Sequence, residues 1–271
     1  MVREFQNKRP SEPFSSGCSG LNVNELTSPP RDERPRKVSE STEIEVKFFA
    51  PEHVVKSIIR TTPSIKLEQH YFPKNVVQQL KDEFALHALV DDSSAFTVAR
   101  IRRTEPSSGN TEYQVEFKGP KDGICRREFG IDISKDVYRS LIKLATAGSV
   151  EKRRFHVNGH IEYQGRRFQT VAEVDVIRKA GRPASPVPVL LGTIDVEISS
   201  ADATKTLAVV TALRQGRHSF DFLRECVELM SDERDLGRAL TTRRLAKHGF
   251  DAERRAAVAE LKSAAKDLSK D

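Results

Sequence analysis

The feature that most constrains the fold is an alternation of charged and apolar residues with period two. It begins near Ser41, and its first segment is Glu43–Phe48, in which Glu, Glu and Lys alternate with Ile, Val and Phe. Successive side chains of a β-strand point to opposite faces, so this pattern predicts strands with one ionic face and one apolar face. The same pattern recurs at Val98–Arg102, Gln114–Lys118, Lys152–His156, Ala172–Val176 and Ile194–Ile198.

The ionic face has two interpretations. A solvated strand face explains any one segment taken alone, because antiparallel sheets often expose one polar face to water. The repetition of the same parity in the same order along the chain favours a closed sheet instead. In a β-barrel, the apolar outer face is covered by helices, and the charged lumen can hold water, metal and a polyanion. We therefore expect an α+β protein built on a β-barrel.

The 271 residues are enough for one large domain with tails. Residues 1–40 read as a disordered tail, since prolines interrupt them and apolar residues are sparse. We expect the barrel over 41–200, helices that pack on it over 201–250, and a charged C-terminal helix over 251–271. Within these ranges the patterns predict helices at 51–59, Lys74–Val90, Ser134–Ala145, 202–214, 219–230 and 232–247, with Gly249 as a stop, Asp251 as a cap, and turns at 107–110 and Asn158–Gly159.

Several classes of protein are not expected. No run approaches roughly eighteen uncharged apolar residues, so no transmembrane helix is predicted, and Met1–Pro10 lacks the apolar stretch of a secretory signal. Cys18, Cys125 and Cys226 form no CxxC pair, which argues against a disulfide framework or a zinc site. P-loop, dinucleotide-binding and HExxH motifs do not occur. A reducing, cytoplasmic setting is the expectation.

As a set, the motifs resemble the CYTH domains, also called triphosphate tunnel metalloenzymes, over about residues 41–200. Their form is most similar to the inorganic triphosphatase type. The resemblance is carried by Glu43-Ile44-Glu45-Val46-Lys47, Gln69-His70-Tyr71-Phe72, Arg100-Ile101-Arg102, Glu116-Phe117-Lys118-Gly119-Pro120, Arg126-Arg127-Glu128, Glu151-Lys152-Arg153-Arg154-Phe155, Glu173-Val174-Asp175-Val176 and Leu191–Ile198. The chain departs from the family pattern at an inserted segment, Lys74–Ser94, at Glu116 in place of Thr, and at Gly130 in place of a second Glu.

The resemblance implies an eight-stranded antiparallel barrel, open at both ends, whose inward cations bind a triphosphate. The planar fork of Arg pairs two phosphate oxygens, while Lys acts as a point charge. The residues implied for substrate binding are Lys47, Arg100, Arg102, Lys118, Arg126, Lys152 and Arg154.

The resemblance also implies a site for Mg²⁺ or Mn²⁺, ions that prefer hard oxygen ligands. One ion would lie on the phosphates and a second would position the attacking water. The implied ligands are Glu43, Glu45, Asp175, Asp195 and Glu197. Two general bases stay open: a metal-bound water, or Tyr71 together with Lys118. Nearby cations are expected to lower the pKa of Lys118 and to favour a tyrosinate, which predicts an alkaline optimum.

We expect a metal-dependent triphosphatase acting on inorganic triphosphate or on a nucleoside or thiamine triphosphate. The alternatives are a class IV-type adenylate cyclase, which makes cyclic AMP from ATP, and a non-catalytic polyphosphate- or nucleotide-binding module. A further alternative is a nucleic-acid binder that uses the N-terminal tail and the arginine-rich segment Thr241-Thr242-Arg243-Arg244, but the sequence lacks the interleaved basic and aromatic residues typical of such surfaces. The net charge of +6 permits an anionic small-molecule substrate. No membrane or nucleic-acid partner is expected, and a homodimer is left open.

Overall fold

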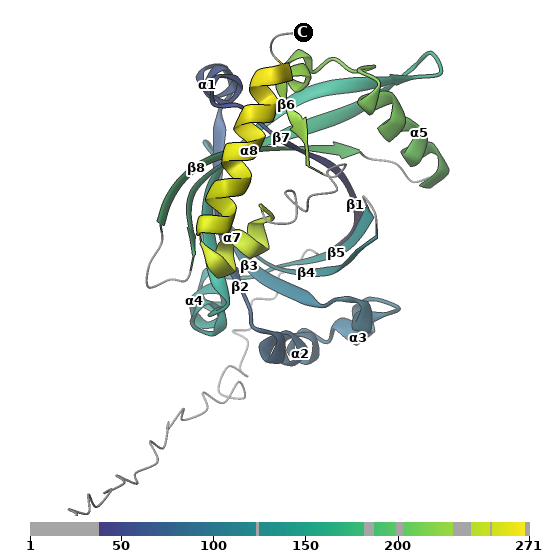
Figure 1. The fold of residues 1–271 in the computed structure, drawn as a ribbon. Coiled ribbons are helices and arrows are strands. Elements are labelled where there is room, and N and C mark those ends of the chain that lie inside the picture. Colours follow the sequence, from purple (N-terminus) through teal and green to yellow (C-terminus); the bar gives the residue numbers. More distant parts are fainter. Residues whose placement is uncertain are drawn as a thin grey trace, which may run out of the picture. The chain divides into compact units, whose positions relative to one another are not determined.

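The computed structural model describes residues 38–122, 125–181, 187–198, 203–229, 240–249 and 251–268. Strands and helices are both abundant in these ranges, so the chain is an α+β protein (Figure 1). The expected N-terminal tail falls on residues outside the described ranges, except for 38–40, which already belong to the first strand. No helix in the described ranges is both long enough and apolar enough to cross a membrane.

Eight strands pair antiparallel in a closed order, β5-β4-β3-β2-β6-β7-β8-β1 and back to β5. Strand β1 closes the ring, because it pairs with β8 through Glu45–Phe49 and with β5 through Val38–Ile44. A short strand, β9, adds to β1 outside this ring. The strands are β1 Val38–Phe49, β2 Ser64–Tyr71, β3 Val98–Glu105, β4 Glu112–Asp122, β5 Cys125–Asp132, β6 Gly148–Tyr163, β7 Arg166–Gly181, β8 Val187–Ile198 and β9 Val227–Glu228.

Helices connect and cover these strands. Their bounds are α1 Glu52–Thr61, α2 Lys74–Glu83, α3 Leu86–Leu89, α4 Lys135–Leu141, α5 Ala203–Arg214, α7 Thr242–His248 and α8 Ala252–Leu268, with 3₁₀ turns at Ser93–Ala95, Ile142–Leu144 and Asp221–Glu225. The predicted caps are present: the Asp251 side chain accepts a hydrogen bond from the backbone N–H of Arg254 at 3.1 Å. Gly249 ends α7 with a φ of 66°.

Two of the predicted helices were wrong. The helix expected over Lys74–Val90 is broken at Ala85, which takes a φ of 50° and separates α2 from α3. The helix expected over 219–230 is a 3₁₀ turn followed by β9, because the Leu229 N–H bonds the Lys47 carbonyl at 2.8 Å and joins this segment to the sheet. The helix expected over 232–247 is present over its described part as α7, Thr242–His248, and the stretch 230–239 lies outside the described ranges.

The turn expected at Asn158–Gly159 lies inside β6 instead. The hairpin between β6 and β7 turns at Gln164 and Gly165, which both have positive φ, 49° and 70°. Gly159 is required for close packing and does not form a turn, since a Cβ there would collide with the ring of Phe220. A glycine in a strand often marks such a close approach.

The apolar residues of the alternation are buried as expected. Ile44, Val46 and Phe48 of β1 belong to a cluster with Val54 and Ile58 of α1, and α5 adds Val209, Val210 and Leu213 to the same cluster. Burying these side chains stabilises the fold by about 1.5–3 kcal/mol for each large residue, relative to exposure. The apolar side chains therefore form the outer face of the ring, and the charged side chains of the opposite parity point inward.

A second apolar cluster holds α7 and α8 against the strands. Leu245 and Ala246 of α7 are fully buried and pack with Tyr71 of β2 and Val98 of β3, and α8 adds Val258 and Leu261. Helix α7 contacts β6, β7 and β2. This cluster brings the C-terminal helices to the cavity that the strands surround.

Candidate functional site

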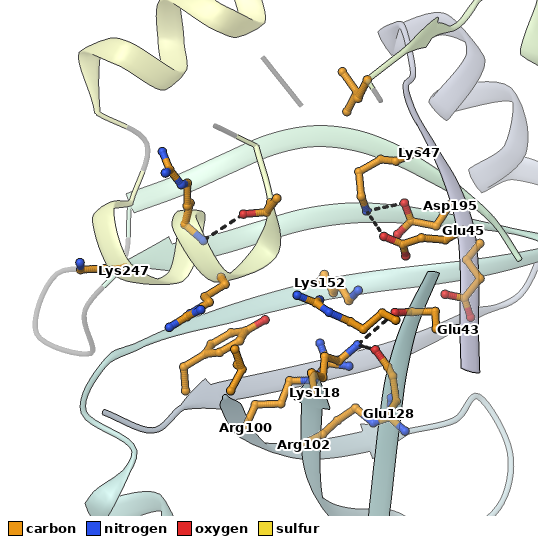
Figure 2. Close-up of a pocket in the computed structure, with 18 of the residues that line it drawn as sticks. Glu43, Glu45, Lys47, Arg100, Arg102, Lys118, Glu128, Lys152, Asp195 and Lys247 are labelled. Carbon is orange, nitrogen blue, oxygen red and sulfur yellow. Dashed lines mark hydrogen bonds and ion pairs between the residues drawn. The ribbon is translucent and has the colours of Figure 1, made fainter. Parts of the chain in front are cut away.

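A cavity of about 970 Å³ is lined by side chains from all eight strands of the ring and from the α7–α8 region. The alternation explains this, because residues of one parity on every strand point to the same side of the sheet. Of the predicted site residues, the cavity lining contains Glu43, Glu45, Lys47, Tyr71, Arg100, Arg102, Lys118, Arg126, Lys152, Arg154, Asp195 and Glu197. Figure 2 shows several of these side chains directed toward one another from different strands.

Glu116 pairs with two of the predicted phosphate-binding arginines. It lies opposite Arg100 in the β3–β4 register and forms an ion pair with it, and its second oxygen lies 2.6 Å from Nη1 of Arg102. Burial alone would raise the pKa of Glu116, but Arg100 and Arg102 outweigh it and hold that pKa well below its usual value. Glu116 was noted in the sequence only as a departure from the family pattern, yet it is the counter-ion that lets two arginines share a buried wall.

Asp175 has a similar role and does not line the cavity. Nε and Nη2 of Arg154 each donate to an Asp175 oxygen at 2.8 Å, and Lys152 donates to Oδ2. The resemblance implied a metal ligand at this position, and the structure shows that two cations hold this carboxylate. Burial and the neighbouring Arg154 lower the pKa of Lys152 to about 8, against the opposing effect of Asp175.

Carboxylates gather where β1 meets β8. Glu45 is the register partner of Glu197, and Lys47 is the partner of Asp195 and forms an ion pair with it. Burial raises the pKa of Asp195 to about 6 despite Lys47, with Glu45 adding to the rise. Burial, together with the neighbouring Glu173, raises the pKa of Glu197 to about 7. These acids therefore lie close enough to oppose one another's ionisation.

A second group of carboxylates lies where β1 meets β5. Lys118 forms an ion pair with Glu128, and its Nζ lies 3.6 Å from Oε2 of Glu43 (Figure 2). Burial raises the pKa of Glu43 to about 8, and a hydrogen bond with Glu128 contributes, while Lys118 opposes the rise. The prediction placed Lys118 among cations, but the structure also gives it two acidic neighbours.

The residue types at the β1 junctions fit a divalent cation. Buried carboxylates that face one another must either share protons or bind a cation, and carboxylate oxygens are the ligands that Mg²⁺ and Mn²⁺ prefer. Among the described residues, no group of three Asp, Glu, His or Cys side chains stands in a ready-made ligand geometry. The agreement with a divalent cation is therefore one of donor chemistry.

Tyr71 lies in the cavity wall on β2, opposite Arg100 in the β2–β3 register. Its side chain is 4% exposed. Both candidate proton-transfer residues, Tyr71 and Lys118, line the cavity, and within the described part of the chain no hydrogen bond joins them.

Sequence reasoning missed several lining residues. Glu128 and Glu173 lie within the quoted motifs, and their parity with Arg126 and Asp175 was a signal that could have identified them. No such signal marked the residues of the C-terminal region. Arg243 and Arg244 had been noted only as a nucleic-acid surface. The C-terminal lining residues are Thr241, Arg243, Arg244, Lys247, His248, Asp251, Glu253 and Arg254.

Comparisons with known proteins give similar solved structures at low identity. No family model and no curated protein matches the chain. The PH1819 protein of Pyrococcus horikoshii is 18% identical, with a TM-score of 0.41, over 64% of this chain and 86% of its own. The inorganic triphosphatase NE1496 is 19% identical, with a TM-score of 0.36, over 76% of this chain and 97% of its own. A candidate adenylate cyclase of Bacillus halodurans is 11% identical, with a TM-score of 0.39, over 74% and 99%.

Proposed function

We propose that this chain is a CYTH-type triphosphatase that uses Mg²⁺ or Mn²⁺ to hydrolyse a phosphoanhydride bond of inorganic triphosphate or of a nucleoside or thiamine triphosphate. The observation that carries the proposal is the single cavity into which the closed ring of strands directs both its cations and its carboxylates. A triphosphate is highly anionic, and phosphoryl transfer requires mainly alignment and neutralisation of its charge. The strand motifs of the sequence support the same family.

The arginines and lysines of the wall would bind the phosphates. Arg100, Arg102 and Arg154 are each held by a buried carboxylate, which fixes their orientation before a substrate enters. Preorganised donors lose little freedom on binding and favour the charge that develops in the transition state. A triphosphate would compete with the carboxylates for the N–H donors of these side chains.

The carboxylates at the β1 junctions would hold the metal. Glu45, Asp195 and Glu197 supply oxygens at the β1–β8 junction, and Glu43 supplies them beside β5. When bound, a divalent ion would neutralise phosphate charge and favour deprotonation of the attacking water. Tyr71, in the wall beside Arg100, is the side chain proposed to accept that proton at its Oη, while Lys118 orients a phosphate group.

The test is phosphate release from inorganic triphosphate, with and without Mg²⁺ or Mn²⁺, across neutral to alkaline pH. Glu45→Gln and Lys118→Gln should each lower kcat/KM by about a hundredfold or more. Glu40→Gln and Lys66→Gln are matched controls, because Glu40 pairs with Arg127 and Lys66 with Glu105 at exposed positions outside the cavity lining. Equal release by Glu45→Gln and wild type would contradict the proposal.

A parallel incubation with ATP separates hydrolysis from cyclisation. Phosphate or pyrophosphate without a cyclic nucleotide supports the triphosphatase. Cyclic AMP as the main product would show that the ribose hydroxyl, rather than water, is the nucleophile, and would replace the proposed function with the cyclase. Binding without any turnover would indicate a polyphosphate- or nucleotide-binding module.

A further inference from the structure

Four cations from the C-terminal region have no role in the proposed hydrolysis. Arg243, Arg244 and Lys247 of α7 and Arg254 of α8 all line the cavity, although none belongs to the strand ring. Helix α7 is held firmly in place. A Cβ at Gly148, the first residue of β6, would collide with the Ala246 carbonyl, so the helix lies directly on the strand backbone. These cations therefore sit on a fixed wall.

Arg254 is the most constrained of the four. It is 2% exposed, and its Nε is buried without a hydrogen-bond partner in the described part of the chain. Its Nη1 pairs with Asp251, which is itself partly exposed, and lies 3.5 Å from a Glu253 oxygen. The charge of Arg254 is therefore paired, but its buried Nε–H is costly without an acceptor. Because Arg254 lines the cavity, an anion bound there would supply that acceptor.

The α7 cations differ from most of the ring cations in their partners, Arg126 being the exception, since its Nε donates to the Gly119 carbonyl. Each of Lys47, Arg100, Lys118, Lys152 and Arg154 forms an ion pair with a carboxylate. In contrast, Arg243, Arg244 and Lys247 form no ion pair within the described ranges. Burial and the charges of Arg254, Lys247 and Arg244 together lower the pKa of the adjacent His248, in keeping with an excess of positive charge at this corner. Arg243, Arg244 and Lys247 are therefore available to bind an anion.

The cations and carboxylates that line the cavity lie in groups from one side of it to the other. Figure 2 shows Lys247 on one side and Glu43, Glu45 and Asp195 on the other, with Arg100, Lys118 and Lys152 between them. A compact triphosphate held by the middle group and the carboxylates would leave Lys247 and its neighbours without a partner. Apolar lining is confined to Val98, Leu229 and the ring of Tyr71, which is little for a nucleoside, since nucleobases bind largely by stacking on aromatic side chains.

We propose that Arg243, Arg244, Lys247 and Arg254 form a second phosphate-binding subsite, which we call the α7–α8 subsite, and that the substrate is a linear inorganic polyphosphate of more than three phosphates. One end of the chain is bound at the carboxylate side of the ring, and the phosphates beyond the third reach the α7–α8 subsite. This rests on the proposed function, because it specifies the substrate class of the same cavity.

The test measures kcat/KM with inorganic triphosphate, size-fractionated longer polyphosphate and ATP, in wild type and in Arg254→Gln, Lys247→Gln and Arg243→Gln. Wild type should favour the longer polyphosphate. We compare kcat/KM for the longer polyphosphate with kcat/KM for triphosphate, and each variant should lower this ratio. For Arg254→Gln the ratio should fall by about tenfold, because the variant loses a charge-assisted hydrogen bond. Arg255→Gln is the matched control, since Arg255 is the next residue of α8 and lies outside the cavity lining. Lys247 and Arg243 are exposed, so their variants test the subsite even if Arg254→Gln does not fold.

Calorimetric binding of the same two phosphates in metal-free buffer separates this inference from the proposed function. Tighter binding of the longer chain, lost in Lys247→Gln, supports the α7–α8 subsite even if no phosphate is released from either compound, an outcome that removes only the hydrolase. Equal binding of both phosphates by wild type overturns the subsite while leaving the triphosphatase intact. A preference for ATP over the longer chain also overturns it.

Discussion

At the scale of single residues, the site is a set of buried charged side chains that form ion pairs with one another. Glu116 illustrates this, because it pairs with both Arg100 and Arg102. Two buried guanidinium groups without a counter-ion would repel each other and lose hydration. The carboxylate therefore stabilises the empty cavity and orients the arginines for an anion.

Glu116→Gln should lower the free energy of unfolding at pH 7 by about 3 kcal/mol, the usual cost of breaking a buried ion pair. The pKa of Glu116 is depressed in the folded state, so its contribution is present above the usual Glu pKa and is lost as the pH falls. The gap between variant and wild type should therefore shrink between pH 5 and acidic pH, as followed by urea unfolding. Glu112→Gln, at an exposed position of β4, is the control. A gap that stays constant with pH would contradict the stabilising role of the Glu116 charge.

Tyr71→Phe tests the proposed proton acceptor. Removal of the hydroxyl should lower kcat by about a hundredfold, within the usual range for general base catalysis, with little change in KM. The ring remains to fill its place in the apolar cluster beside α7. Steady-state kinetics with inorganic triphosphate from neutral to alkaline pH would give both constants, and turnover equal to wild type would remove Tyr71 from the mechanism.

At the scale of elements, the position of α7 decides what the cavity contains. The helix is short, running from Thr242 to His248, and it lies on the start of β6, where only a glycine fits. Gly148 also has a φ of 134°, which L-residues rarely adopt. The element is thus positioned by the strand backbone rather than by its own helical propensity, which is marginal at this length.

Gly148→Ala should separate α7 from β6. The added Cβ collides with the Ala246 carbonyl, so the variant should be less stable than wild type by about 1–3 kcal/mol beyond the backbone strain. Amide hydrogen exchange in α7 should quicken more than exchange in the ring strands. Gly165→Ala is the matched control, because Gly165 also has positive φ, 70°, but nothing lies within 4 Å of its Cβ position. Equal effects of the two substitutions would mean that strain alone is responsible.

At the scale of the whole molecule, closure of the ring concentrates charge. Strand β1 pairs on both sides, so Glu45 meets Glu197 across one junction and Glu43 meets Arg126 across the other. A polyanion and a cation that bind only this closed arrangement would stabilise the folded protein by mass action.

Inorganic triphosphate with Mg²⁺ should therefore raise the melting temperature. At about a hundred times its Kd, a ligand adds about 2.7 kcal/mol, which corresponds to roughly 5 °C or more for a chain of this size. Differential scanning calorimetry would measure the shift, with orthophosphate at equal ionic strength as the control, because it offers one phosphate instead of three. Equal shifts for the two phosphates would show that the cavity does not recognise a phosphate chain.

Sequence reasoning was most successful where structure follows from local pattern. The alternation at Glu43–Phe48 correctly predicted a strand whose apolar residues are buried and whose charged residues face the cavity. It was less successful where long-range contacts override local preference. The helix expected at 219–230 became β9 because its backbone bonds to β1, and Gly159 lies within a strand because Phe220 packs on it.

The sequence by itself determined the strands, the parity of their ionic face and most of the lining residues on the strands of the ring, because side-chain alternation is a property of the strand backbone. Only the tertiary structure decided which charges neutralise which. Lys47 and Asp195 are 148 positions apart, and the role of Asp175 as a counter-ion depends on Arg154 from the neighbouring strand. It also decided that Arg254 lines the cavity, because that placement comes from the packing of α7 and α8 on strands far away in the chain. Local pattern fixes the direction of a side chain, whereas its partner depends on contacts between distant segments.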